Sequence, residues 1–93
     1  MTEGDRERRR IVAHGQVQGV FFRAQVLERA RAQGVAGFAR NRADGSMEAA
    51  FEGRAHAVEQ MVAWCAEGPE KARVTRLDVI EEEPIGVAGF RVR

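Results

Sequence analysis

The order of the predicted secondary structure indicates an α+β fold. Apolar residues alternate along several short segments, they repeat with helical spacing along two longer ones, and turns rich in glycine or proline separate the segments. Two strand–helix–strand crossovers joined by a hairpin give a ferredoxin-like βαββαβ sandwich, an antiparallel four-stranded sheet with a short additional C-terminal strand and both helices on one face. The predicted strands cover about 8–14, 35–42, 46–53, 73–81 and 90–92, and the predicted helices cover about 22–33 and 54–67.

The third predicted strand shows the clearest alternation. Its apolar positions are Met47, Ala49 and Phe51, and the intervening positions include Glu48 and Glu52. Successive side chains of a strand point to opposite faces of the sheet. We therefore expect one face of this strand to pack on the core and the other to meet water.

Each predicted helix carries one apolar stripe. In the first helix, Val26, Leu27 and Ala30 share a face, and Arg23 lies one turn before Val26 at the top of the same stripe. We therefore expect the Arg23 guanidinium to point toward the sheet, and we expect Gly34 to end the helix as a left-handed cap. The second helix ends before a glycine and a proline. Its stripe consists of Val58, Met61, Val62 and Cys65.

Composition limits the size and class of the protein. Its 93 residues, of which 44% are hydrophobic and 31% charged, suit one soluble domain with a single core. Residues 1–7 are expected to form a flexible tail and 8–93 the folded domain. The polar N-terminus and the absence of a long apolar run predict neither a secretory signal nor a membrane span. A single cysteine excludes an internal disulfide, so a cytoplasmic location is expected.

Arginines cluster at the start of the first strand, over 6–10. Such a cluster could form a nucleic-acid-binding arm. Glu7 interrupts it, however, and the net charge of the whole chain is only +1. We therefore interpret the cluster as the solvated entrance of a strand, and we predict no nucleic-acid partner.

A glycine-rich loop joins the first strand to the first helix. Gly15 and Gly19 allow tight backbone turns, and a loop that leads into a helix presents free N–H groups to an anion. Arg23 lies in the first helical turn, where its guanidinium can donate two hydrogen bonds to the same anion. The loop lacks the Gly-Lys-Ser/Thr ending of a nucleotide-binding loop. The pattern therefore indicates a site for one phosphate group, without a nucleoside triphosphate or its magnesium.

Other catalytic chemistries fit the sequence less well. Cys65 lies on the apolar stripe of the second helix, and position 71, where a cysteine-phosphatase loop would need arginine, is Lys71, so Cys65 is interpreted as a core residue. His14 and His56 lack a spaced cluster of carboxylates or thiolates, so no metal and no cofactor are predicted. Hydrolysis without a protein nucleophile or a metal remains. An acyl phosphate suits such a reaction because its carboxylate is a good leaving group.

Asn41 allows two interpretations. A carboxamide carries a donor and an acceptor on one plane, so it can hold a water molecule at a fixed angle. Asn41 also precedes the hairpin signal Asp44-Gly45, and asparagine is common near turns because it tolerates left-handed backbone geometry. Without further information, the turn-forming interpretation is favoured and both stay open.

Two stretches of the chain resemble the signatures of a known family. The first is glycine-rich and ends in arginine: Gly15-x-Val17-Gln18-Gly19-Val20-x-Phe22-Arg23. The second surrounds the predicted hairpin: Gly37-Phe38-Ala39-Arg40-Asn41, Asp44-Gly45 and Gly53. Both resemble the acylphosphatases, small enzymes that hydrolyse the carboxyl–phosphate bond. The resemblance covers roughly residues 8–93.

The resemblance implies roles for the matched residues. Arg23 and Asn41 would be catalytic, with Arg23 binding the phosphate and Asn41 positioning the attacking water. A phosphate oxygen of the substrate would accept the proton, and Gln18 would mainly shape the loop. His14 occupies a variable position of the motif, which implies a structural or peripheral role. The phosphate-binding set would comprise Gly15, Gln16, Val17, Gln18, Gly19, Val20 and Arg23.

The chain departs from the family pattern at two apolar positions. Ala13 stands where a branched aliphatic residue is usual, and Met47 stands where valine is usual. Both changes fall on predicted strands. They affect packing and leave the polar and loop residues unchanged.

The resemblance also implies the partners. The substrate would be a small-molecule acyl phosphate and one product inorganic phosphate, with no cofactor, no membrane and a monomeric protein. No stretch of the sequence describes a pocket for the acyl side. An RNA-binding module of the same topology would expose aromatic residues on its central strands, whereas here only Phe51 is available, on the apolar side. A larger carbamoyl-transferring maturation factor with a similar first domain would need zinc-binding and transferase domains after Arg93.

Overall fold

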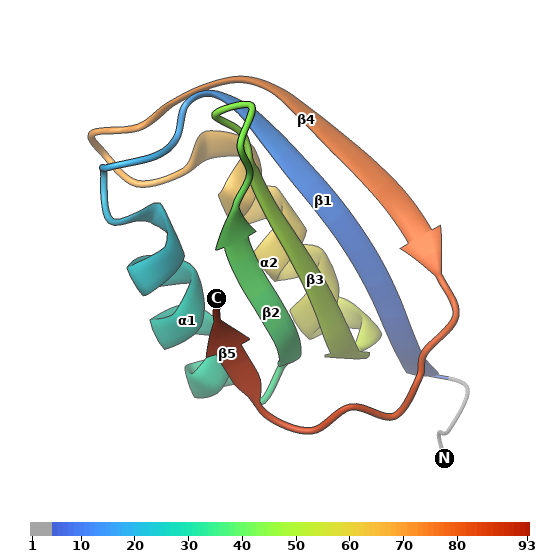
Figure 1. Cartoon of the computed structure of the whole chain (residues 1–93). Helices are drawn as coiled ribbons and strands as arrows, with labels where there is room; N and C mark the ends of the chain where they lie inside the picture. The colour runs from blue at the N-terminus through green and yellow to red at the C-terminus, as the bar shows by residue number, and fades with distance from the viewer. Residues whose placement is uncertain (1–4) are drawn as a thin grey trace.

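The computed structural model describes residues 5–93. Helices and strands follow one another as predicted (Figure 1), and each begins and ends within two residues of its expected bounds. The strands are β1 (Arg6–Gln16), β2 (Ala36–Asn41), β3 (Met47–Arg54), β4 (Arg73–Glu82) and β5 (Phe90–Val92). The helices are α1 (Phe22–Gln33) and α2 (Ala55–Glu67). No helix in residues 5–93 is long and apolar enough to cross a membrane.

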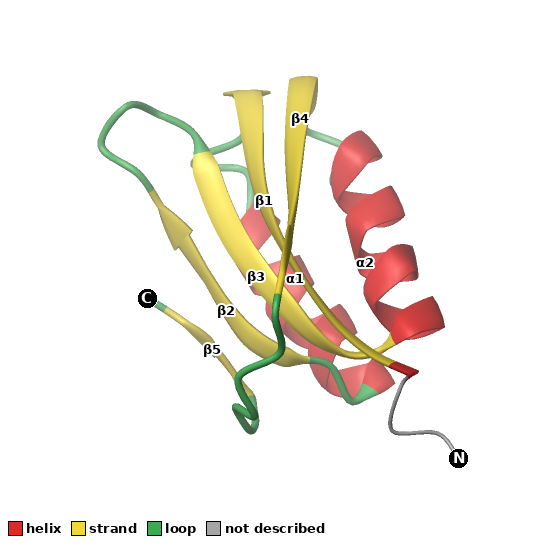
Figure 2. Ribbon diagram, turned by 90° about the vertical axis from the view of Figure 1, so that its right-hand side faces the viewer, coloured by secondary structure: helices red, strands yellow, loops and turns green. Residues whose placement is uncertain are grey.

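All five strands form one sheet, in the order β4-β1-β3-β2-β5. The first four are antiparallel neighbours, and β5 runs parallel to β2 at the edge. Both helices cover the same face of this sheet (Figure 2), which confirms the ferredoxin-like α+β prediction. Backbone hydrogen bonds connect both ends of β5 to β2. The backbone N–H of Gly37 donates to the oxygen of Gly89, and the N–H of Arg93 donates to the oxygen of Ala39.

The core lies between the sheet and the helices. Phe22 of α1 meets Trp64 of α2 edge to face, with 5.6 Å between ring centroids. Phe51 of β3 stacks on Phe90 of β5 at 5.8 Å. The predicted helix stripes face these rings, and Gly34 ends α1 in the predicted left-handed conformation. The stripe residues that are buried are Val26, Ala30, Val58, Met61 and Cys65, while Leu27 and Val62 are partly buried.

The other face of β3 does not meet water, and the prediction from alternation is wrong here. The residues Glu48 and Glu52 are only 8% and 0% exposed. Glu52 accepts hydrogen bonds from the guanidinium of Arg8 and from the backbone N–H groups of Ile85 and Gly86. The segment after β4 therefore covers this end of the sheet. Alternation within one strand cannot reveal such a cover, because the covering groups come from distant parts of the chain.

An ion-pair network extends along the same face. Arg10 donates to both Glu48 and Glu82, and Arg40 donates to Glu48 at 2.6 Å. Arg8 bridges Glu82 and the buried Glu52. The hydrogen bond from Arg10 is the main reason that the pKa of Glu82 is lowered from its ordinary value. The prediction of a solvated strand entrance is therefore wrong for Arg8, which is only 6% exposed, because arginines of this cluster pair with carboxylates across the sheet.

Two local features differ from the prediction. β1 begins at Arg6, so Arg6 and Glu7 belong to the sheet and not to the expected tail; the rest of that tail, residues 1–4, lies outside the described residues. The register of β1 against β4 shifts after His14, which breaks the alternation of β4. Simple alternation over 73–81 predicts Thr75, Leu77 and Val79 on one face, whereas Val74 and Leu77 pack toward the core.

Candidate active site

The loop between β1 and α1 needs glycine for two different reasons. Gly15 has φ +121°, and a Cβ atom at this position would lie 2.1 Å from the backbone oxygen of Arg73 in β4. Gly19 has φ +74° and open space around it, so its left-handed backbone alone favours glycine. Gly15 therefore lets β4 approach the start of the loop closely, and Gly19 lets the chain turn toward α1.

The N-terminus of α1 faces this loop without a side-chain cap. Its N-cap residue, Phe21, has φ 62°, and within residues 5–93 no side chain makes a capping hydrogen bond and the first turn contains no acidic residue. The first-turn N–H groups of a helix have no partner within the helix, and its dipole favours negative charge there. This helix start can therefore receive an anion.

Gln18 fastens the loop to the β2–β3 hairpin. Its Nε2 donates to the backbone oxygens of Arg42 and Ser46, at 2.8 and 3.0 Å. The hairpin itself is held by Asp44, whose Oδ1 accepts from the backbone N–H and the hydroxyl of Ser46. These bonds fix the spacing between the loop and the end of β2. Asn41, the last residue of β2, is part of neither set.

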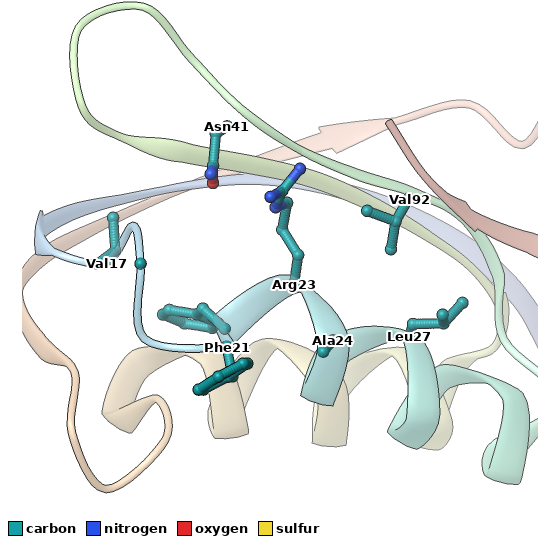
Figure 3. Close-up of a pocket in the computed structure, with 9 residues that line it drawn as sticks. Val17, Phe21, Arg23, Ala24, Leu27, Asn41 and Val92 are labelled. Atoms are coloured by element: carbon teal, nitrogen blue, oxygen red, sulfur yellow. The ribbon is translucent and has the colours of Figure 1, made fainter.

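Arg23 and Asn41 line one pocket of about 410 Å³ between the loop, α1 and the end of β2. Figure 3 shows both side chains directed into the same space, Arg23 from the first turn of α1 and Asn41 from β2. The sequence analysis predicted Arg23 and Asn41 from two separate motifs, and the fold brings these two residues into one pocket.

The polar atoms of this pair have few partners in the protein. Arg23 is half-buried, and its Nη1 donates to the backbone oxygen of Arg93 at 2.8 Å. Asn41 Oδ1 is buried and has no hydrogen-bond partner among residues 5–93. Buried polar side-chain atoms nearly always have a partner in a folded protein. No hydrogen bond to its oxygen from residues 5–93 therefore holds the Asn41 carboxamide in place.

The predicted phosphate-binding residues fall into two groups. One group lines the pocket: Val17, Gly19 and Arg23. The other lies in or beside the loop without lining the pocket: Gly15, Gln16, Gln18 and Val20. The side chain of Val17 is buried in the core, so the loop offers backbone groups rather than side chains to the pocket.

The sequence analysis missed the apolar part of the pocket. Phe21, Ala24, Leu27 and Val92 also line it. The helical spacing of Arg23, Ala24 and Leu27 could have indicated that the stripe beside the arginine continues into the site. Val92 gave no such signal, because only the parallel pairing of β5 with β2 brings it there.

The other titratable candidates lie elsewhere. His14 Nε2 lies 2.9 Å from Asp78 Oδ2, and His14 does not line the pocket. Cys65 is fully buried, and burial raises the pKa of its thiol to about 12. It is therefore a protonated core residue at neutral pH. Within residues 5–93, no group of three or more His, Cys, Asp or Glu side chains could hold a metal ion.

The glycine-rich loop and the arginine at the helix start give this α+β fold a site that suits a phosphoryl group. The sequence model of the acylphosphatase family matches residues 9–92. An acylphosphatase of Rubrobacter xylanophilus is 53% identical over 89 residues, which cover 94% of this chain and 80% of that protein. The chain therefore belongs to the acylphosphatase family, and it hydrolyses acyl phosphates.

Solved structures agree with this assignment. An acylphosphatase from Coxiella burnetii superposes with a TM-score of 0.92 at 29% identity, covering 100% of both chains. The crystal structure of an acylphosphatase from Bacillus subtilis gives a TM-score of 0.88 at 33% identity, covering 94% of this chain and 98% of that one. Both confirm the predicted family and fold.

Proposed function

We propose that the loop from Gly15 to Val20 and the guanidinium of Arg23 bind the phosphoryl group of the acyl phosphate. The uncapped start of α1 lies beside the loop, and Arg23 lies in its first turn. Among residues 5–93 only the oxygen of Arg93 accepts a hydrogen bond from this guanidinium. Four of its five N–H donors therefore stay available, and two of them can bind one phosphoryl group in parallel.

Asn41 then orients the attacking water. Its buried Oδ1 lacks a protein partner, and this single observation favours the water-binding interpretation over the turn-forming one. The turn has its own hydrogen bonds, from Asp44 to Ser46 and from Gln18 to the backbone. A water molecule bound to this carboxamide would be held at a fixed angle in the pocket that Asn41 and Arg23 line.

The reaction needs little else from the protein. The water oxygen forms a bond to phosphorus, and the bond between phosphorus and the acyl oxygen breaks. The carboxylate leaves with the bonding electrons, and the water proton passes to a phosphoryl oxygen, which gives inorganic phosphate. Negative charge on the phosphoryl oxygens is stabilised by the guanidinium and the backbone N–H groups. A carboxylate is a good leaving group, so no general acid is required.

Gln18 acts as a positioning residue. It joins the loop that holds the phosphoryl group to the hairpin that follows Asn41. The distance between the bound phosphoryl group and the bound water therefore depends on the hydrogen bonds of Gln18. Small errors in that distance are costly, because the reacting atoms must lie close together and in line.

Hydrolysis in water labelled with heavy oxygen tests the proposed attack. The label should appear in inorganic phosphate and not in the carboxylate, because the new bond forms at phosphorus. Inorganic phosphate should also inhibit competitively, since it occupies the same loop and guanidinium. Label in the carboxylate would show attack at the carbonyl carbon and would overturn the assignment of Asn41.

A further inference from the structure

The pocket that contains Arg23 and Asn41 is much larger than a phosphoryl group needs. Apart from these two residues and the loop residues Val17 and Gly19, its lining consists of apolar side chains: Phe21, Phe22, Ala24 and Leu27 at and after the start of α1, and Val92 from β5. Figure 3 shows Phe21, Ala24 and Leu27 along α1, on the opposite side of the pocket from Asn41, and Val92 beyond Arg23. The pocket therefore has an apolar lining along α1 that faces the polar groups of Asn41 and Arg23.

Phe21 is an unusual member of this apolar lining. Its side chain is 76% exposed, so it contributes little to the core. Its backbone is left-handed, with φ 62°, and it is the only non-glycine residue of residues 5–93 with a positive φ. A bulky residue in this conformation is strained, because its Cβ atom crowds the backbone. A strained and exposed ring at the edge of a pocket fits a ligand-contacting role better than a packing role.

The reaction geometry determines which part of the substrate meets this surface. In a phosphoryl transfer the attacking and leaving oxygens lie roughly in line with the phosphorus. If Asn41 holds the water on one side of the phosphoryl group, the acyl group leaves on the opposite side. That direction leads away from Asn41, toward the apolar lining along α1.

We propose that Phe21, Ala24, Leu27 and Val92 form an acyl-binding surface, which makes the enzyme selective for acyl phosphates with a hydrocarbon acyl group. The inference rests on the proposed function, because it takes the phosphoryl group to lie at Arg23. Residues of this surface offer the acyl group no charged partner and no side-chain hydrogen bond. Substrates with small or polar acyl groups, such as carbamoyl phosphate, gain little from it.

A series of straight-chain substrates tests the selectivity of the native enzyme. Acetyl, propionyl, butyryl and hexanoyl phosphates have leaving groups of similar basicity, so their intrinsic reactivities are similar. We expect kcat/KM to rise about two- to fourfold for each added methylene, the range that partial to full burial of one CH₂ group gives. Because four residues of α1 rise about 6 Å, the increase should end once the chain passes Leu27. A kcat/KM that does not change along the series would overturn the proposal.

Variants at Phe21 then locate the effect. Phe21→Asn removes the ring with a residue that tolerates left-handed backbone, and it should lower the hexanoyl-to-acetyl ratio of kcat/KM about three- to tenfold. Phe21→Leu restores an apolar side chain and should recover most of the ratio. Ile85→Ser is the matched control, since Ile85 is 65% exposed and lies outside this pocket. An unchanged ratio in Phe21→Asn, or an equal fall in Ile85→Ser, would contradict the inference.

Val92→Ser provides an independent variant on β5. It should lower the same ratio without a change in the affinity for inorganic phosphate, because phosphate does not reach this surface. If Phe21→Asn fails to fold, the substrate series and Val92→Ser together test the acyl-binding surface. Two other results would show that the proposed function itself is wrong. With every acyl chain, the label from heavy-oxygen water would appear in the carboxylate, or inorganic phosphate would not compete with the substrate.

Discussion

Two side chains with buried oxygens, the carboxylate of Glu52 and the carboxamide of Asn41, lie at opposite ends of the β2–β3 pair and differ in their hydrogen bonds. Glu52, near the end of β3, is fully buried and accepts hydrogen bonds from Arg8, from Ile85 and from Gly86. Asn41, at the end of β2, has a buried Oδ1 without any partner among residues 5–93. The same small fold therefore satisfies one polar group completely and leaves another unsatisfied.

The difference separates structural from functional polar groups. A buried carboxylate is tolerated only when hydrogen bonds and charges replace its hydration, and the groups around Glu52 do so. An unpartnered amide oxygen lowers stability and is retained where it serves another purpose. We therefore expect substitutions at the Asn41 end to change catalysis and substitutions at the Glu52 end to change stability.

The largest effect is expected for Arg23→Gln. Loss of the guanidinium should lower kcat about a thousandfold or more and should also weaken phosphate binding, since the group contacts the phosphoryl oxygens before and during the reaction. Arg31→Gln is a matched control: Arg31 lies on the same helix and donates to the backbone oxygen of Phe90 in β5, but it does not line this pocket. Steady-state kinetics and phosphate inhibition constants should change for Arg23→Gln alone.

Asn41→Ala should lower kcat by a factor on the order of a hundred to a thousand, the effect of removing one preorganised group. Phosphate affinity should stay nearly the same, because Asn41 holds the water and not the phosphoryl group. The melting temperature should stay equal or rise, since a buried unpartnered oxygen is removed. A folded variant with nearly native kcat would assign Asn41 to a structural role.

Glu52→Ala should have the opposite pattern. We expect a loss of about 3 kcal/mol in the free energy of unfolding, because Arg8 is only 6% exposed and loses one of its two carboxylate partners. Glu81→Ala is the control: this residue pairs with Arg9 but is 80% exposed, so its loss should change stability by less than about 1 kcal/mol. Denaturant unfolding measures both, and kcat of the folded fraction should not change.

A smaller effect is expected on acidification. Burial tends to raise the pKa of Glu52, but hydrogen bonds from the backbone of Ile85 and Gly86 and from Arg8 outweigh it, so the pKa lies below its ordinary 4.5. A carboxyl with a lowered pKa contributes stability above its unfolded-state pKa and loses it as the pH falls through the folded value. The difference in melting temperature between the native protein and Glu52→Gln should therefore shrink below about pH 4.5.

The smallest effect is expected for thiol reagents and chelators. Cys65 is fully buried and its thiol pKa is raised to about 12 by burial, so alkylation of the native enzyme should be slow and should follow unfolding. A chelator should leave kcat unchanged, because no step of the proposed reaction uses a cation. Rapid inactivation with retained circular dichroism, or rescue by added zinc, would contradict the mechanism.

Local sequence patterns predicted the fold well where neighbouring residues determine the structure. Glycine positions, helical stripes and the Asp44-Gly45 turn set the element order and the start of α1 correctly. Arg23 and Asn41 could be predicted as a pair because each belongs to a motif, and the fold brings them into one pocket. The Arg23→Gln and Asn41→Ala variants test whether the two residues bind the phosphoryl group and orient the water.

The missed features depend on contacts between distant segments. The cover over Glu52 comes from Ile85 and Gly86, and the apolar wall of the pocket includes Val92. No periodicity within β3 or β5 contains this information. The bulge opposite His14 is likewise set by the pairing of two strands and not by either strand alone.

The position of β1 within the sheet has a consequence for folding kinetics. β1 lies between β3 and β4, so Arg8 pairs in register with both Glu52 and Glu82, 44 and 74 residues further along the chain. Long loops must close before either pairing can stabilise the nascent sheet. We therefore expect this protein to fold more slowly than a helical bundle of the same length, with a rate limited by chain topology rather than by helix formation.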